Sequence, residues 1–199
     1  MAESAMYHVR LLEKFDFDDI VISIKSSNVL SMIEAYERVG AMCNYPLHLG
    51  VTESGTERMG IIKSSIGIGS LLTKGIGDTI RVSLTDDPVK EVYAGFDILK
   101  GIGLYNETPQ LVSCPTCGRT KIDLISLAKE IEEKLRGVKK NITVAVMGCA
   151  VNGPGEAREA DIGVAGGDGE GLIFKKGEIL RKVPQDKIVE ELMKEIELM

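Results

Sequence analysis

Two cysteines, Cys114 and Cys117, have the spacing of a metal-binding or redox-active pair. They stand in the run Cys-Pro-Thr-Cys-Gly, where two intervening residues let one turn hold one metal centre. A dithiol redox motif, half of a zinc site and half of an iron–sulfur site all use this spacing. The pair alone therefore leaves three chemistries open.

A third cysteine, Cys149, helps to decide among these three chemistries. Tetrahedral zinc would need a fourth Cys or His, yet the two histidines, His8 and His48, lie in the other half of the chain. Three thiolates on a four-iron cluster leave one iron open to an oxygen ligand. Glu156, after an Asn-Gly-Pro-Gly turn, is the obvious oxygen donor, although the helix dipole alone would also favour a glutamate at a helix start. The pattern favours an iron–sulfur centre and hence a redox enzyme.

Composition excludes several other classes of protein. The net charge is −6 and the pI is about 5.1, which argues against a broad nucleic-acid surface. No apolar run reaches the roughly 18 residues of a membrane span, and the first residues do not read as a signal peptide. We therefore expect a cytoplasmic protein with reduced thiols, without a membrane or nucleic-acid partner.

The elements that must position such a site begin with three strand–helix units. We expect strands at 18–25, 46–53 and 78–84, and helices at 29–39, 59–71 and 88–100, the second one interrupted near Gly67 and Gly69. Parallel strands at this spacing fit a (β/α) barrel or a doubly wound sheet. Three units cannot close an eight-stranded barrel, so either the sheet is open or the chain is part of a longer one.

Polar residues lie near the carboxyl ends of these strands: Lys25, Glu53, Arg81 and Ser83. The carboxyl ends of parallel strands lie at the same edge of a sheet or barrel, so we expect the four side chains to lie together at that edge. Arg81 and Ser83 are two residues apart and should point to the same side. Lys25 and Arg81 could equally be ordinary strand-end charges, and we interpret His48, between two leucines, as structural.

The character of the sequence changes near residue 106, and we expect domains at 1–105 and 106–199. The second domain should hold strands at 111–113 and 142–147, a helix at 124–136, a hairpin around the glycine-rich turn 166–171, and an amphipathic helix at 185–198. Both cysteine segments then follow strand ends. Cys43 reads as a small hydrophobic residue at a helix end.

The motifs CPTCGR at 114–119 and GCAVNGPGEA at 148–157 resemble the 4-hydroxy-3-methylbut-2-enyl diphosphate synthase family. Five further segments resemble the same family in the same order: KSS at 25–27, HLGVTESG at 48–55, KSSI at 63–66, GIGDTIRVSLT at 75–85 and GFDILK at 95–100. The resemblance covers essentially the whole chain.

This resemblance implies a fold and a cofactor. The fold would be the C-terminal part of a (β/α)8 TIM barrel followed by a small α/β domain. That domain would hold a [4Fe–4S] cluster on Cys114, Cys117, Cys149 and Glu156. The family's N-terminal barrel portion, with several diphosphate-binding arginines, has no counterpart here. The resemblance thus implies a fragment that is inactive alone.

The resemblance also implies a reaction and partners. Family members reductively open and dehydrate 2-C-methyl-D-erythritol 2,4-cyclodiphosphate, giving 4-hydroxy-3-methylbut-2-enyl diphosphate in the non-mevalonate pathway of isoprene biosynthesis. Lys25, Arg81 and Ser83 would bind the diphosphate, and Glu53 would be the acid–base residue. Flavodoxin or ferredoxin would donate electrons to a homodimer.

Two other hypotheses use the same cysteines differently. A non-enzymatic scaffold would bind zinc through the three cysteines, with Glu156 or a partner residue as the fourth ligand. A thiol–disulfide protein would use only Cys114 and Cys117, so replacing Cys149 would leave it active.

Overall fold

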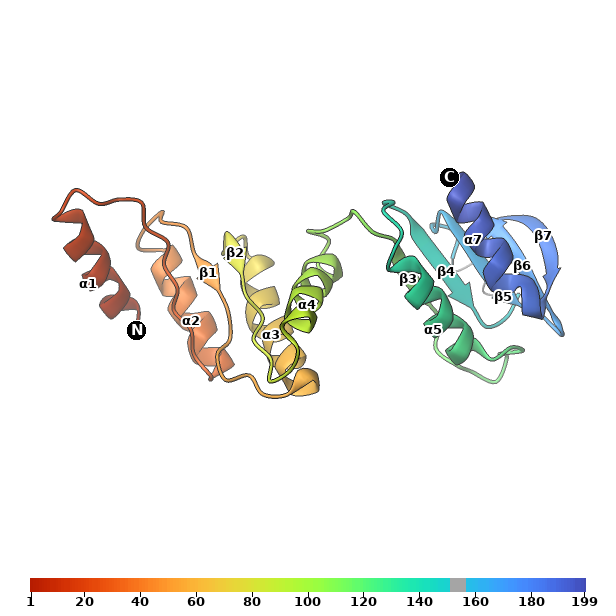
Figure 1. Ribbon diagram of the computed structural model, residues 1–199, viewed down its shortest axis with the longest axis horizontal. Helices are drawn as coiled ribbons and strands as arrows, with labels where there is room; N and C mark the ends of the chain where they lie inside the picture. Colours follow the sequence, from red (N-terminus) through yellow and green to blue (C-terminus); the bar gives the residue numbers. More distant parts are fainter. Residues whose placement is uncertain (151–156) are drawn as a thin grey trace. The chain divides into compact units, whose positions relative to one another are not determined.

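The computed structural model describes residues 1–150 and 157–199. It divides into two compact units, Met1–Tyr105 and Asn106–Met199 (Figure 1). Each unit encloses its own apolar core, and both contain parallel strand pairs. The chain is therefore an α/β protein; the partial-barrel and cluster-domain roles of its units stay predictions.

The first unit alternates extended segments with helices. Its elements are α1 (Ala2–Glu13), α2 (Val29–Gly40), β1 (His48–Leu49), α3 (Glu57–Leu72), β2 (Thr79–Ile80) and α4 (Pro88–Gly101). Strands β1 and β2 pair in parallel, and residues 22 and 26 form parallel bridges to 47 and 51. Each helix from α2 to α4 follows one extended segment, and consecutive helices contact each other (Figure 1). The predicted order of three extended segments, each followed by a helix, is confirmed. The strand predicted at 18–25 is a correction, since this segment forms only isolated bridges. Helix α1 was not predicted.

Regular pairing between segments 22–26 and 47–52 is shorter than the sequence predicts, because the hydroxyl of Tyr36 lies between the two segments. Backbone bonds join the segments on either side, with Ile22 N–H donating to the Pro46 carbonyl at 2.8 Å and Thr52 N–H donating to the Ser26 carbonyl at 3.3 Å. Between them, Ile24 N–H donates to Tyr36 Oη at 2.8 Å instead. The ladder is interrupted at this point.

Side chains alternate along the segments, as the period of a strand requires. Residues with even numbers in 20–24 and odd numbers in 47–51 are buried against the helices: Ile20, Ile22, Ile24, Leu47, Leu49 and Val51. Val21, at one of the intervening positions, is 60% exposed. By this alternation Lys25 and His48 point to the side opposite the buried residues of their own segments.

Helix α3 corrects one prediction, since it continues through Gly67 and Gly69 without a break. A Cβ at Gly67 would lie 2.8 Å from Met32 Cε and 2.9 Å from Val51 Cγ2. Glycine here lets α3 pack closely against α2 and the extended layer, so its role is packing rather than interruption.

The second unit is a five-stranded sheet in the order β3-β4-β5-β6-β7. The strands are β3 (Gln110–Ser113), β4 (Thr143–Met147), β5 (Ile162–Gly166), β6 (Glu170–Lys175) and β7 (Glu178–Pro184). β3, β4 and β5 pair in parallel, whereas β5–β6 and β6–β7 are antiparallel. The predicted hairpin is confirmed. Strand β7 was not predicted; it follows a turn in which Lys176 and Gly177 both have positive φ, as a two-residue hairpin turn requires.

Helices α5 (Leu124–Leu135) and α7 (Ile188–Leu198) contact each other and the sheet, and both lie on the same side of it in Figure 1; the short η1 (Gln185–Lys187) precedes α7. Ile131, Leu192 and Ile196 are at most 1% exposed. A smaller cluster that includes Ala145, Ala165 and Phe174 forms a second core. In the described part of the chain, no helix is both long and apolar enough to cross a bilayer.

Candidate functional site

Cys114 and Cys149 lie at the same edge of the second unit. Ser113, the last residue of β3, pairs with Val146 of β4, so Cys114 and Cys149 follow the carboxyl ends of neighbouring parallel strands. The N–H of Gly148 donates a hydrogen bond to Cys114 Sγ at 3.3 Å. Cys114 is half-buried and Cys149 is 6% exposed. The sheet therefore brings two of the three predicted sulfur ligands together.

Cys117 lies on the exposed turn that leaves β3. Its carbonyl accepts a hydrogen bond from Thr120 N–H at 3.0 Å, and its own N–H donates to Thr120 Oγ1 at 3.2 Å. Lys121 N–H then donates to the Gly148 carbonyl at 3.0 Å. The turn that carries Cys117 is thus attached to the segment that carries Cys149.

The turn also favours the charged form of the Cys117 thiol. Hydrogen bonds from the backbone and side chain of Arg119 lower the pKa of Cys117 below its ordinary value, and the Thr120 hydroxyl adds to this effect. Burial acts in the opposite direction but is the weaker influence. A thiolate is the form that binds metals.

The donor chemistry of this edge fits an iron–sulfur centre. All four cysteines are free, and N–H groups that donate to ligand sulfurs are among the features that tune such centres. Within residues 1–150 and 157–199, no three His, Cys, Asp or Glu side chains form a closed metal-binding group. Glu156, the predicted fourth ligand, lies outside the described residues.

The first unit holds three basic residues that influence one another electrostatically: Lys25, His48 and Arg81. A Cβ at Gly50 would lie 3.3 Å from Lys25 Cε and 2.9 Å from the Arg81 carbonyl oxygen, so glycine permits this approach. Burial, and then the charge of Arg81, lowers the pKa of Lys25. We call these three residues the basic cluster.

His48 is a member of this cluster that the sequence did not identify. Its Nδ1 lies 2.8 Å from Thr79 Oγ1, across the β1–β2 register. Burial, and then the charges of Lys25 and Arg81, lowers the pKa of His48. The available signal was its position, since His48 alternates with the buried Leu47 and Leu49 and must face away from them.

Ser83 and Glu53 differ in their relation to the cluster. Arg81 donates to Ser83 Oγ through Nη2 at 3.0 Å and through Nε at 3.2 Å, so the two side chains share a side as predicted. Among the described residues, Glu53 makes no hydrogen bond or ion pair with the cluster. Its φ of 52° is uncommon for a residue other than glycine, and such backbone strain concentrates at functional sites.

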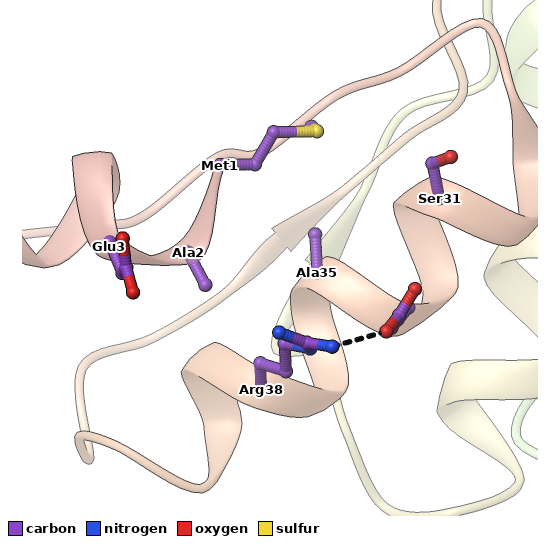
Figure 2. A pocket seen from close by; sticks show the side chains of 7 residues that line it. Met1, Ala2, Glu3, Ser31, Ala35 and Arg38 are labelled. Atoms are coloured by element: carbon purple, nitrogen blue, oxygen red, sulfur yellow. Dashed lines mark hydrogen bonds and ion pairs between the residues drawn. The ribbon is translucent and has the colours of Figure 1, made fainter.

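A separate surface cavity of about 370 Å3 lies between α1 and α2 (Figure 2). Its lining includes Met1, Ala2, Ser31 and Ala35. The ion pair drawn in Figure 2 joins Arg38 to Glu34 on the same helix. The lining includes no cysteine and no member of the basic cluster, so this cavity is not part of the candidate site.

Comparison with known proteins gives consistent matches over both units. The family model described as the GcpE TIM-barrel domain matches residues 1–96, and the model of the GcpE protein C-terminal domain matches residues 110–198. The chain is 66% identical over 197 residues to a 4-hydroxy-3-methylbut-2-en-1-yl diphosphate synthase (flavodoxin) from Clostridium perfringens. It is 63% identical over 196 residues to the protein of the same name from Clostridium tetani.

These matches cover nearly all of the chain but only part of each relative. The alignments include 99% and 98% of the chain, and 56% of the length of each relative. A third relative with the same name, from Clostridium acetobutylicum, is 63% identical over all 199 residues, which are 57% of its length. The chain therefore spans little more than half the length of these relatives.

Proposed function

The chain belongs to the GcpE family, and from this membership we propose that it carries the iron–sulfur centre and diphosphate-binding residues of a 4-hydroxy-3-methylbut-2-enyl diphosphate synthase. The observation that carries the proposal is the meeting of two cysteine segments at one sheet edge. Gly148 N–H donates to Cys114 Sγ there, one residue before Cys149. The whole chain resembles relatives that are named for this activity.

The proposed ligands of the centre are Cys114, Cys117, Cys149 and Glu156. Three thiolates and one carboxylate form an unsymmetrical set, which leaves one iron with a weaker ligand than the others. When bound, a [4Fe–4S] cluster would supply electrons one at a time. The C-terminal unit would then be a cluster domain, and the first unit would contribute strands to a TIM barrel.

The basic cluster would bind the diphosphate of the substrate. Lys25 and Arg81 offer cationic donors to phosphate oxygens, and Ser83 adds a hydroxyl that Arg81 already holds in place. His48 would add a ring N–H as a further donor to the same oxygens. Together these groups would orient the cyclic diphosphate so that its ring can open in one direction.

The proposed reaction balances with two electrons and two protons. The cyclodiphosphate gains both, a carbon–oxygen bond of the ring opens, and one oxygen leaves as water to give 4-hydroxy-3-methylbut-2-enyl diphosphate. Glu53 would hold or deliver a proton at the departing oxygen, since a carboxyl group near a leaving group can act as a general acid. Its exposed position leaves it able to reach a bound substrate.

The proposal includes partners and a location. The names of the relatives mention flavodoxin, and we propose flavodoxin or ferredoxin as the electron donor of this chain. We also propose a homodimer in the cytoplasm, where thiol ligands stay reduced. Analytical ultracentrifugation of the iron-loaded protein should give twice the mass of one chain.

Iron and sulfide content after anaerobic reconstitution tests the proposal most directly. We expect about four irons per chain and the broad visible absorption of an iron–sulfur centre. Cys149→Ser should lose both, whereas Cys43→Ser should keep them, because Cys43 is a half-buried thiol of the first unit. Equal iron content in the two variants would contradict the ligand assignment.

The same experiment separates the other two hypotheses. A colourless protein with stoichiometric zinc would favour the scaffold, and the redox proposal would be wrong. A protein that binds no metal but keeps disulfide-exchange activity in Cys149→Ser would favour a thiol-redox protein that uses Cys114 and Cys117.

A further inference from the structure

Thr120 lies between the two cysteine segments. Its Oγ1 accepts a hydrogen bond from Cys117 N–H at 3.2 Å, and its N–H donates to the Cys117 carbonyl at 3.0 Å. These two bonds close the turn around Cys117 from both sides. The conformation of the turn therefore depends on where Thr120 is held.

The same side chain packs on the segment that carries Cys149. A Cβ at Gly148 would lie 2.9 Å from Thr120 Oγ1 and 3.0 Å from Thr120 Cγ2. Threonine and glycine thus approach more closely than two side chains could. The next residue along the chain, Lys121, donates its N–H to the Gly148 carbonyl at 3.0 Å and fixes this approach.

Gly148 links this contact to the remaining cysteine, since its own N–H donates to Cys114 Sγ at 3.3 Å. Thr120 accordingly touches the Cys117 turn directly and reaches Cys114 and Cys149 through one residue. We propose that Thr120 is a positioning residue that sets the separation of the three sulfurs. The inference rests on the proposed function, because the sulfurs need a fixed separation only if they share a centre.

The hydroxyl is the part of the threonine side chain that carries this role, because it bonds the Cys117 backbone. The methyl group lies on the side of Gly148. A β-branched side chain also has few χ1 rotamers, so it can maintain both contacts at little entropic cost. Outer-shell partners of metal ligands typically change metal affinity about 10- to 100-fold when they are replaced.

Iron retention tests the inference without any activity measurement. The whole chain is reconstituted anaerobically with iron and sulfide, and the rate of iron loss to a chelator is measured together with the reduction potential. Thr120→Val keeps the shape of the side chain but loses the hydroxyl. It should lose iron about 10-fold faster than the unsubstituted chain, with a shifted potential. Thr120→Ser keeps the hydroxyl and should lie close to the unsubstituted chain.

Thr116→Val is the matched control, since Thr116 is exposed on the same turn, beside Cys117. It should retain iron like the unsubstituted chain. Equal iron loss from Thr120→Val and Thr116→Val would overturn the inference while leaving the cluster in place. So would equal loss from Thr120→Val and Thr120→Ser, because the hydroxyl would then have no role. If the unsubstituted chain itself takes up no iron, the proposed function fails, and this inference fails with it.

Discussion

The hydroxyl of Tyr36 donates a hydrogen bond of 2.5 Å to the carbonyl oxygen of His48. It also accepts one of 2.8 Å from Ile24 N–H, so one side chain of α2 stands where two strands would otherwise bond each other. Burial raises the pKa of Tyr36, which keeps the hydroxyl protonated and able to donate. Helix α2 thereby fixes the backbone that carries His48, a member of the basic cluster.

Tyr36→Phe should destabilise the protein by about 1–3 kcal/mol, because it leaves the Ile24 N–H and the His48 carbonyl without their partner. Chemical denaturation monitored by circular dichroism measures this change in the free energy of unfolding. Tyr45→Phe is the control, since the Tyr45 hydroxyl bonds Glu13 at an exposed position. A loss no larger than that of Tyr45→Phe would show that the buried bridge contributes nothing.

The Tyr36 bridge is also an example of a contact that cannot be predicted from local sequence patterns. Alternation and Gly or Pro punctuation are local signals, and they located α4, α5, β4 and the hairpin. The shared edge of Lys25 and Arg81 followed from the parallel order of the strands. The Tyr36 bridge depends on distances between segments that are far apart in sequence, so no local pattern could reveal it.

Helix α1 was not predicted because its sequence pattern is weak. Helix α1 buries only Ala2, Met6 and Val9, and no side chain caps its start, so its apolar stripe is narrow and its boundary unmarked. The side of the strand that His48 faces could have been inferred from alternation. Its proximity to Lys25 and Arg81 required the three-dimensional structure.

Gly67→Ala should destabilise the protein by about 1–3 kcal/mol, because the new methyl group would overlap Met32 Cε and Val51 Cγ2. Gly69→Ala is a matched control in the same helix, where a Cβ would meet no atom within 4 Å. It should stabilise the protein by roughly 0.5–1 kcal/mol, since alanine favours helix over glycine. Thermal and denaturant unfolding measure both changes; the same sign for both would refute the packing role of Gly67.

Inorganic pyrophosphate should bind the basic cluster. Lys25→Gln or Arg81→Gln should raise the dissociation constant for pyrophosphate about 10- to 100-fold, which is the usual contribution of a charge-assisted hydrogen bond. Isothermal titration calorimetry at constant ionic strength gives these constants. Lys14→Gln removes one exposed charge at the end of α1 and serves as the control. If Lys14→Gln weakens binding as much, the affinity reflects net charge rather than a site.

The stability of the protein should fall as the pH drops below about 6.5, in part because of His48. Burial and the charges of Lys25 and Arg81 lower its pKa from the ordinary value of 6.5, so the unfolded chain takes up this proton at a higher pH than the folded chain does. Between the two pKa values the unfolded state binds more protons, and the free energy of unfolding therefore decreases as the pH decreases.

His48→Gln should flatten this part of the stability profile, measured by denaturant unfolding at a series of pH values from about 7.5 to 5. His8→Gln, on the exposed surface of α1, is the matched substitution at the other histidine of the chain. Saturating pyrophosphate should reduce the effect in the unsubstituted protein, because a bound anion offsets the charges of Lys25 and Arg81 and favours the protonated ring. An equal slope in His48→Gln and the unsubstituted chain would place His48 outside the influence of the two cations.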